Sequence, residues 1–176
     1  MGYQFAVGTT PVGLNVKSWR SPVDFRESDL GPIDSWMLPT LSLTSGGRYY
    51  VSLRGVNGQG SAGPACVSGP FVFDLTPPIK PMATPSASTG TGGQLRIDFS
   101  SISDPESGIN RIEYCIGRSL GTDNILQWRS AGTALSTVVD VMKLNLQRGT
   151  PYYLGARTFN NAGMQSPEFW TLIQVQ

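Results

Sequence analysis

Large apolar residues alternate with small or polar ones along much of this chain, which is the pattern of half-buried β-strands. The alternation is clearest in residues 3–8, 95–99 and 112–117. Apolar residues do not recur at helical spacing over three turns anywhere, so the predicted fold class is all-β. The further expected strands are residues 16–19, 35–43, 70–74, 81–88, 125–128, 137–144 and 169–175.

The same pattern is written twice. Residues 41–60 match residues 144–163 without a gap, so that Tyr49 and Tyr152 are equivalent at a spacing of 103 residues. Residues 3–8 match residues 112–117 at a spacing of 109. Short solenoid and propeller repeats recur every 20–50 residues or so, and a period near one hundred therefore predicts two all-β domains in tandem.

A proline-rich stretch at residues 74–81 marks the expected boundary, because closely spaced prolines favour an extended connector. The predicted domains are residues 1–76 and 82–176, joined by a linker at 77–81. The first domain has no counterpart of the two strands that open the second. Three explanations stay open: a truncated fragment, completion by strands of another chain, and a smaller rearranged sheet.

Charge and composition exclude several classes of function. The net charge is +1 and the charges are spread along the chain, which argues against nucleic-acid binding. The sequence contains no run of about 18 apolar residues, so insertion into a membrane is not expected. The chain has no histidine and no Gly-x-Ser-x-Gly elbow, so it is not expected to be an enzyme. Cys66 and Cys115 occupy non-equivalent positions, which favours two free, mostly buried thiols over an interdomain disulfide.

At this point the chain resembles tandem fibronectin type III, or closely related immunoglobulin-like, sandwich domains. The resemblance implies that Tyr152, and Tyr49 in the first copy, form the tyrosine corner of that fold. Phe99 departs from the pattern, since the family usually has tryptophan there. The matching residues of the second domain are Leu95-x-Ile97-x-Phe99, Ile112-x-Tyr114-x-Ile116, Leu146-x-x-Gly149-x-x-Tyr152 and Asn160-Asn161-Ala162-Gly163.

An acidic turn at residues 104–108 offers a candidate calcium site. In a sandwich of this topology, Asp104 and Glu106 would share one pole of the domain with Asp74 of the connector and Asn160. Carboxylate and amide oxygens are ligands that Ca²⁺ accepts. The competing interpretation is an Asx-type turn built by Asp104, which needs no metal and is favoured.

The tryptophans raise the question of ligand stacking. Trp36 follows a six-residue insertion in the first copy and is the candidate for an exposed ligand platform, against a plain packing role. Trp19 and Trp128 are repeat-equivalent, which favours packing on a sheet face. Arg54 and Arg157 are equivalent as well, and are expected on a solvated face with their stems on neighbouring tyrosines.

The resemblance implies a non-catalytic extracellular module, of the spacer or adhesion type, from a larger secreted or cell-surface protein. Its ligand would be a protein or a glycan of unknown identity. One alternative is a carbohydrate-binding accessory module of a secreted hydrolase, which Trp36 would serve. Another is a filament subunit whose incomplete first domain self-associates by strand complementation.

Overall fold

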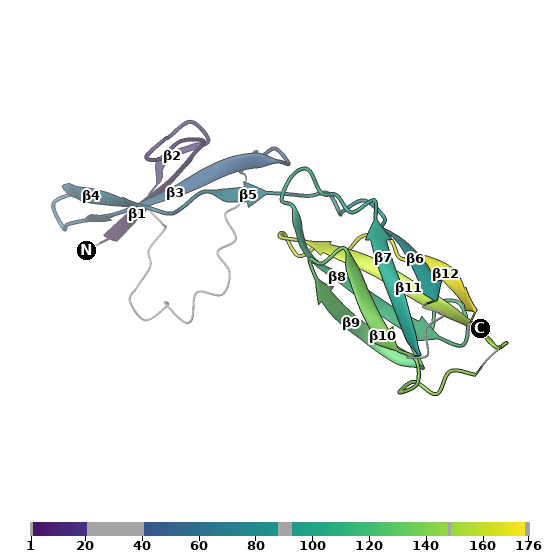
Figure 1. Ribbon diagram of the computed structural model, residues 1–176. Coiled ribbons are helices and arrows are strands. Elements are labelled where there is room, and N and C mark those ends of the chain that lie inside the picture. Colours follow the sequence, from purple (N-terminus) through teal and green to yellow (C-terminus); the bar gives the residue numbers. More distant parts are fainter. Residues whose placement is uncertain (1, 21–40, 88–92, 148, 175–176) are drawn as a thin grey trace. The chain divides into compact units, whose positions relative to one another are not determined.

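The computed structural model describes residues 2–20, 41–87, 93–147 and 149–174 of the 176. Every regular element in these ranges is a β-strand, which confirms the all-β class. No helix among them is long and apolar enough to cross a bilayer. The chain divides into two compact units, unit 1 (Met1–Asp74) and unit 2 (Leu75–Gln176), seen in Figure 1.

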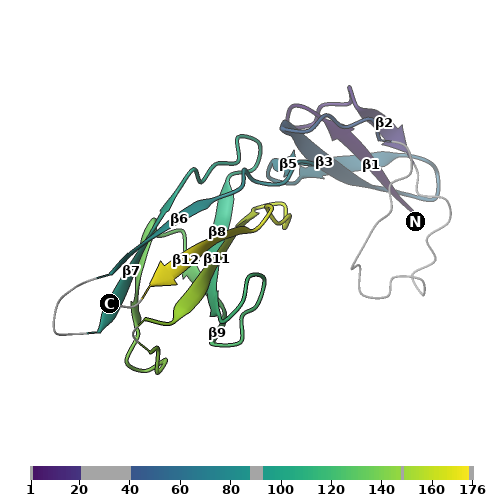
Figure 2. The same cartoon turned by 90° about the vertical axis from the view of Figure 1, so that its right-hand side faces the viewer.

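Unit 2 consists of two antiparallel sheets that pack face to face (Figure 2). One sheet holds β10 (Ser136–Asp140), β7 (Gln94–Ser100) and β6 (Met82–Ala87), in that order. The other holds β12 (Phe169–Gln174), β11 (Pro151–Asn160), β8 (Ile109–Gly117) and β9 (Leu126–Gly132).

The core of unit 2 lies between these sheets and follows from the alternation in sequence. Successive side chains of a strand point to opposite faces, so every second residue of β7 and β8 points inward. The inward set is buried at the core: Leu95, Ile97, Phe99, Ile112, Tyr114 and Ile116, with Leu154, Ala156 and Ile173 of β11 and β12. Each large side chain buried in this way contributes roughly 1.5–3 kcal/mol to stability.

Unit 1 contains one sheet in its described residues. Its strands run in the order β2 (Lys17–Arg20), β1 (Gly2–Gly8), β3 (Gly47–Val56) and β4 (Ala62–Val67), and β5 (Phe71–Phe73) pairs with the start of β3. This arrangement matches the β9-β8-β11-β12 sheet of unit 2, with β4 and β5 together in the place of β12.

The sequence repeat is also a repeat of strand register. In unit 1, Phe5 pairs with Leu53 and Val7 with Val51. In unit 2, Tyr114 pairs with Ala156 and Ile116 with Leu154, which are the same pairs displaced by 109 and 103 residues. The two offsets read from the sequence therefore position the same antiparallel ladder twice.

The turn that follows the first strand of each ladder is repeated in detail. The side-chain oxygen of Asn15 accepts a hydrogen bond from the N–H of Thr9, and that of Asn124 accepts one from the N–H of Arg118, each at 3.0 Å. Gly117 lies so close to the backbone of Thr122 that any Cβ would clash with it, and Gly8 lies as close to Gly13. A side chain at either glycine would force this turn open.

Two elements differ from the sequence prediction. Strand β4 was not expected from the sequence. The strand expected at residues 137–144 ends at Asp140, because the Asp140 carboxylate accepts hydrogen bonds from the N–H groups of Met142 and Lys143 and starts a turn there. The expected strand at 35–43 lies largely outside the described residues, as does the insertion before it.

Candidate functional site

Both tyrosines that the resemblance singled out are buried and hold a preceding loop. Tyr152 is fully buried, and its hydroxyl accepts a hydrogen bond from the N–H of Gln147 at 2.9 Å. The hydroxyl of Tyr49 accepts one from the N–H of Thr44 at 2.8 Å, again five residues upstream. Glycines with positive φ, Gly149 at 73° and Gly46 at 79°, turn the chain between the two partners.

The acidic turn of unit 2 is organised by the Asp104 carboxylate. Its Oδ1 atom accepts hydrogen bonds from the N–H groups of Ser107 at 2.8 Å and Gly108 at 3.2 Å, which is the geometry of an Asx-type turn. Its Oδ2 atom accepts a bond from the side-chain amide of Asn160 at 3.1 Å. Asp104 is only 8% exposed, so these protein donors supply the solvation that its charge needs.

Asn160 joins three segments of unit 2 through one side chain. Besides Asp104, its amide nitrogen donates to the carbonyl of Thr76 at 3.0 Å. Its oxygen accepts a bond from the N–H of Met164 at 2.8 Å. The residue that was a candidate ligand is thus a buried cross-link between the start of the unit, the Asp104 loop and the turn after β11.

The remaining candidate calcium ligands do not complete a cluster. Glu106 is half-buried in the same turn, and Asp74 is a buried residue at the end of unit 1. Within the described ranges, no three His, Cys, Asp or Glu side chains are grouped closely enough to hold a metal ion. The structure therefore brings Asp104 and Asn160 together, while the calcium assignment of the four residues stays a prediction.

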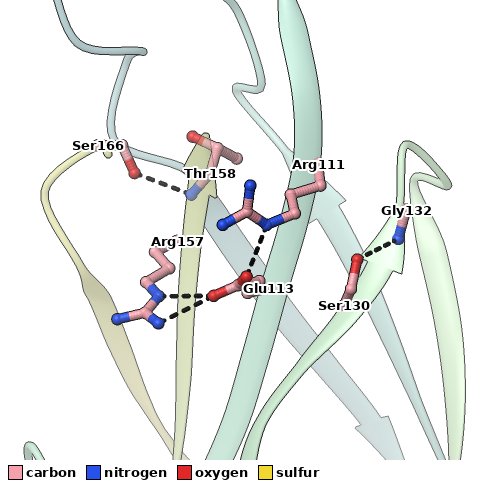
Figure 3. A network of polar contacts seen from close by, with 7 residues as sticks. All are labelled: Arg111, Glu113, Ser130, Gly132, Arg157, Thr158 and Ser166. Carbon is pink, nitrogen blue, oxygen red and sulfur yellow. Dashed lines mark hydrogen bonds and ion pairs between the residues drawn. The ribbon is translucent and has the colours of Figure 1, made fainter. Parts of the chain in front are cut away.

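A second polar cluster covers the side of the β8–β11 sheet that faces away from the core. Glu113 lies between two arginines (Figure 3): its Oε1 accepts from Arg111 Nε at 2.7 Å, and its Oε2 accepts from Arg157 Nε at 2.9 Å. Arg157 also stacks on Trp128, and Arg111 stacks on Phe159 at 3.7 Å from its ring centre. We call this set, together with Trp170, the outer face of unit 2.

The charge balance at Glu113 favours the carboxylate. Desolvation by burial raises the pKa of Glu113, but the hydrogen bonds and positive charges of Arg111 and Arg157 outweigh that effect. Its pKa therefore lies below the ordinary value of 4.5. At neutral pH this group is an ionised acceptor held by two cations, not a proton donor.

Unit 1 carries the same arrangement with an amide in place of the carboxylate. The guanidinium of Arg54 lies 4.1 Å from the centre of the Trp19 ring, and Gln4 stands where unit 2 has Glu113. The Gln4 side-chain oxygen accepts hydrogen bonds from Arg54 Nε at 2.9 Å and Nη2 at 2.7 Å. The guanidinium of each arginine stacks on a tryptophan of a strand two places away in the sheet, a partner that the sequence did not indicate, while the contact of the stems with tyrosines stays a prediction.

The two cysteines are free, and they differ in environment. Cys115 is fully buried, and desolvation raises the pKa of its thiol from 9.0 to about 12. Cys66 is exposed on β4, which corrects the expectation of two mostly buried thiols. A fully protonated, buried thiol is a poor nucleophile, and Cys115 therefore has the properties of a packing residue.

Trp36 lies outside the described residues, so its role as a ligand platform stays a prediction. Sequence reasoning also missed the ion pairs of the outer face. A signal was present, because Glu113 and Gln4 are repeat-equivalent polar residues and each stands directly opposite the repeated arginine.

No protein-family model matches the chain, and no curated protein matches it by sequence. Solved structures are similar to it. The chicken CNTN1 FN1–FN3 domains match 99% of the chain and 56% of their own length, at 17% identity and a TM-score of 0.52. Fibronectin(III)-like modules of Clostridium thermocellum CbhA match 99% of the chain and 77% of their own length, at 13% identity and a TM-score of 0.50.

The spore cortex lytic enzyme SleM of Clostridium perfringens matches 57% of the chain at 15% identity, with a TM-score of 0.46, and the chain spans 29% of that enzyme's length. At such identities the likenesses concern the fold. The CNTN1 and CbhA structures together confirm the resemblance drawn from the sequence: the chain has the fold of fibronectin type III-like domains in tandem.

Proposed function

We propose that this chain is a non-catalytic structural or interaction module that spaces or presents other parts of a larger protein outside the cell or at its surface. The observation that carries the proposal is the state of the polar groups in unit 2. Asp104 is saturated by protein donors, Glu113 is held by two arginines, and Cys115 is buried as a thiol. These three groups stabilise unit 2, and none of them is free to act as an acid, base or nucleophile on a substrate.

The likeness to fibronectin type III structures supports the same proposal at the level of fold. The CbhA modules carry that name in their own description, and the CNTN1 structure comprises domains designated FN1 to FN3. A fold alone does not specify a function, because the sandwich supports many unrelated roles. The proposal therefore depends mainly on the polar side chains that already have partners within the protein. The fold is consistent with it.

Mechanical loading of the full chain tests the spacer role. The chain is held by handles at its two ends and stretched in a single-molecule experiment. We expect unit 2 to unfold in one cooperative step, because its two sheets share one core. Gradual extension of unit 2 at forces too small to measure would contradict a load-bearing role.

Glycan binding tests the interaction alternative. The full chain and its Trp36→Ala variant are screened against a broad set of polysaccharides and glycans, with Trp19→Ala as a control for general loss of an indole. A spacer is expected to bind none of them. Binding that disappears only in Trp36→Ala would replace the spacer by a carbohydrate-binding module.

A further inference from the structure

The chain enters unit 2 through a proline-rich segment that is bonded to the unit before its first strand begins. The carbonyl of Thr76 accepts a hydrogen bond from the Asn160 side-chain amide at 3.0 Å. The N–H of Ile79 donates to the carbonyl of Ser103 at 2.9 Å. We call residues 76–81 the entry segment, and we call these two hydrogen bonds the clasp.

Prolines make the entry segment stiff. Pro78 and Pro81 are fully buried, so the segment lies against the protein and does not project into water. Proline-rich segments are extended and semi-rigid, because each ring fixes one backbone dihedral angle. A pull on this segment therefore reaches the clasp directly, without first straightening a slack loop.

The clasp fixes the entering chain to inner strands of both sheets. Asn160 is the last residue of β11, which lies between β12 and β8. Ser103 lies in the loop after β7, which lies between β10 and β6. In the described sheets, β6 and β12 are edge strands, each hydrogen-bonded to one neighbour. Without the clasp, a pull on the entry segment would act first on the edge strand β6.

Tension across unit 2 runs along its strands. The entry segment contacts Asn160, at the C-terminal end of β11. Strand β12 is antiparallel to β11, and Ile173 near its end pairs with Tyr152 near the start of β11. The chain therefore enters and leaves unit 2 at opposite ends of the sandwich, and a stretched β6 would slide lengthwise along β7.

The Asn160 side chain is held so that its amide faces the entry segment. An amide nitrogen carries two N–H groups, and that of Asn160 donates to Thr76 and, at 3.1 Å, to Asp104 Oδ2. Its oxygen accepts a bond from the N–H of Met164 at 2.8 Å. Asn160 is only 1% exposed, so water does not compete for these bonds. The amide is thus oriented in advance to keep the clasp closed.

We propose that the clasp is a mechanical device: under tension it holds the entry segment on the inner strands and keeps the pull off β6. Asn160 is the positioning residue of the clasp, and Asp104 orients its amide. This inference rests on the proposed spacer role. It adds to that role the point at which force enters unit 2 and the side chain that receives it.

Asn161 gives a matched control in the same turn. Its side-chain nitrogen donates to the carbonyl of Ser107 at 2.7 Å, and its oxygen accepts a bond from Asn110 at 3.3 Å. Neither of these two bonds reaches the entry segment. Asn161→Ala therefore weakens the turn and leaves the clasp in place.

Pulling the full chain from two positions tests the proposal. In a Cys66→Ser background, Leu75→Cys or Met82→Cys provides one handle, and the C-terminal end of the chain provides the other. Leu75 and Met82 are 64% and 51% exposed, and Cys115 is fully buried, so the handle reacts at the intended position. A pull through position 75 must pass the clasp, whereas a pull through position 82 enters β6 directly.

We expect unit 2 to unfold about tenfold more slowly through position 75 than through position 82 at the same force, because one or two net hydrogen bonds then break first. Asn160→Asp should bring this ratio to one, since a carboxylate replaces the donor to Thr76 and keeps the acceptor for Met164. Asn161→Ala should retain the ratio. A merely structural loss would speed unfolding equally in both pulls and leave the ratio unchanged.

Three results would overturn the proposal: equal rates without any change at Asn160, a ratio that survives Asn160→Asp, and a ratio that Asn161→Ala abolishes as well. If Asn160→Asp fails to fold, Ile79→Pro removes the other bond of the clasp and leaves the Asn160 turn intact. The ratio should then fall, and an unchanged ratio would overturn the proposal.

The same recordings separate the clasp from the spacer role on which it rests. Cooperative unfolding at equal rates in the two pulls would overturn the clasp alone. Gradual extension of unit 2 in both pulls, without a cooperative step, would contradict the spacer role and the clasp with it.

Discussion

Arg157 lies over the ring of Trp128, with its guanidinium carbon 4.0 Å from the ring centre. The two residues belong to β11 and β9, which flank β8, so the contact crosses over β8. The equivalent Arg54 and Trp19 stack in the same way at 4.1 Å. This contact is one part of the repeat that lies outside the core, and it ties an edge strand to the sheet in both units.

Replacing this arginine should weaken unit 2. The change Arg157→Met keeps much of the stem but removes the cation–π contact and the hydrogen bonds to Glu113. We expect a loss of about 1–3 kcal/mol in the free energy of unfolding, because the side chain is half-buried. Hydrogen exchange at the buried amides of β8 measures it.

Arg96→Met is the matched control, since Arg96 pairs with Asp98 on an exposed part of β7. Exposed pairs contribute little, so the control should leave the same amides unchanged. Equal losses in the two variants would show that the stacking on Trp128 adds nothing.

The buried hydroxyl of Tyr152 should be worth more than that of its neighbour. Tyr152→Phe leaves the N–H of Gln147 without its acceptor, and we expect a cost of about 1–2 kcal/mol in the free energy of unfolding of unit 2. Tyr153→Phe, on the opposite side of β11, is the control. The free energies of unfolding of the two variants are compared by denaturant titration, with hydrogen exchange as the probe. A Tyr152→Phe variant as stable as the control would show that the hydroxyl does not stabilise the loop.

The Glu113 ion pairs predict that unit 2 loses stability at acid pH. The pKa of Glu113 in the folded state is below its ordinary value of 4.5, so unfolded chains take up the proton first as the pH falls. The stabilisation is complete above about pH 4.5 and is lost as the pH falls from there through the lower folded pKa. Glu113→Gln should flatten that part of the pH profile of unit 2, measured by urea unfolding. A parallel profile in the variant would contradict this.

Thiol labelling should separate the two cysteines. Burial holds the pKa of Cys115 at about 12, so it presents almost no thiolate at neutral pH, whereas Cys66 is exposed. We expect one thiol per native chain to react rapidly with a disulfide reagent, and two in denaturant. Cys66→Ser should abolish the fast reaction. A fast reaction that survives in Cys66→Ser would show that unit 2 opens readily.

Calcium should leave the acidic turn unchanged. Both oxygens of Asp104 already accept hydrogen bonds from protein donors, and a metal ion would have to displace them. We expect no change in melting temperature between millimolar calcium and a chelator. A rise that disappears in Glu106→Gln would instead establish the calcium site.

The sequence made it predictable that the two ladders share one register, because the pattern repeats at two fixed offsets, although it did not say which residues pair. Strand β4 was not predictable, since its sequence Ala-Gly-Pro-Ala-Cys-Val lacks large alternating side chains. It becomes a strand by pairing with β3, and the partner's pattern determines it. Local alternation identifies strands that bury large residues and misses edge strands that do not.

The candidate sites were predictable in part for the same reason. The Asx-type turn of Asp104 is local, and its sequence signal is local too. The stacking of Arg157 on Trp128 joins residues 29 positions apart on strands that are not neighbours, so it depends on the strand order. The strand order is a tertiary property. A sequence repeat can transfer it from one unit to the other only when the order in one of them is already known.

The break between β4 and β5 has a consequence for growth of the unit 1 sheet. The proline at position 70 lies in this break and Pro64 lies in β4, and neither has an N–H to offer a further strand. At the break, the Ser68 hydroxyl accepts a hydrogen bond from the N–H of Val51 in place of a regular ladder contact. A strand from another molecule that approached this edge would find an interrupted row of donors, which disfavours fibril-like extension.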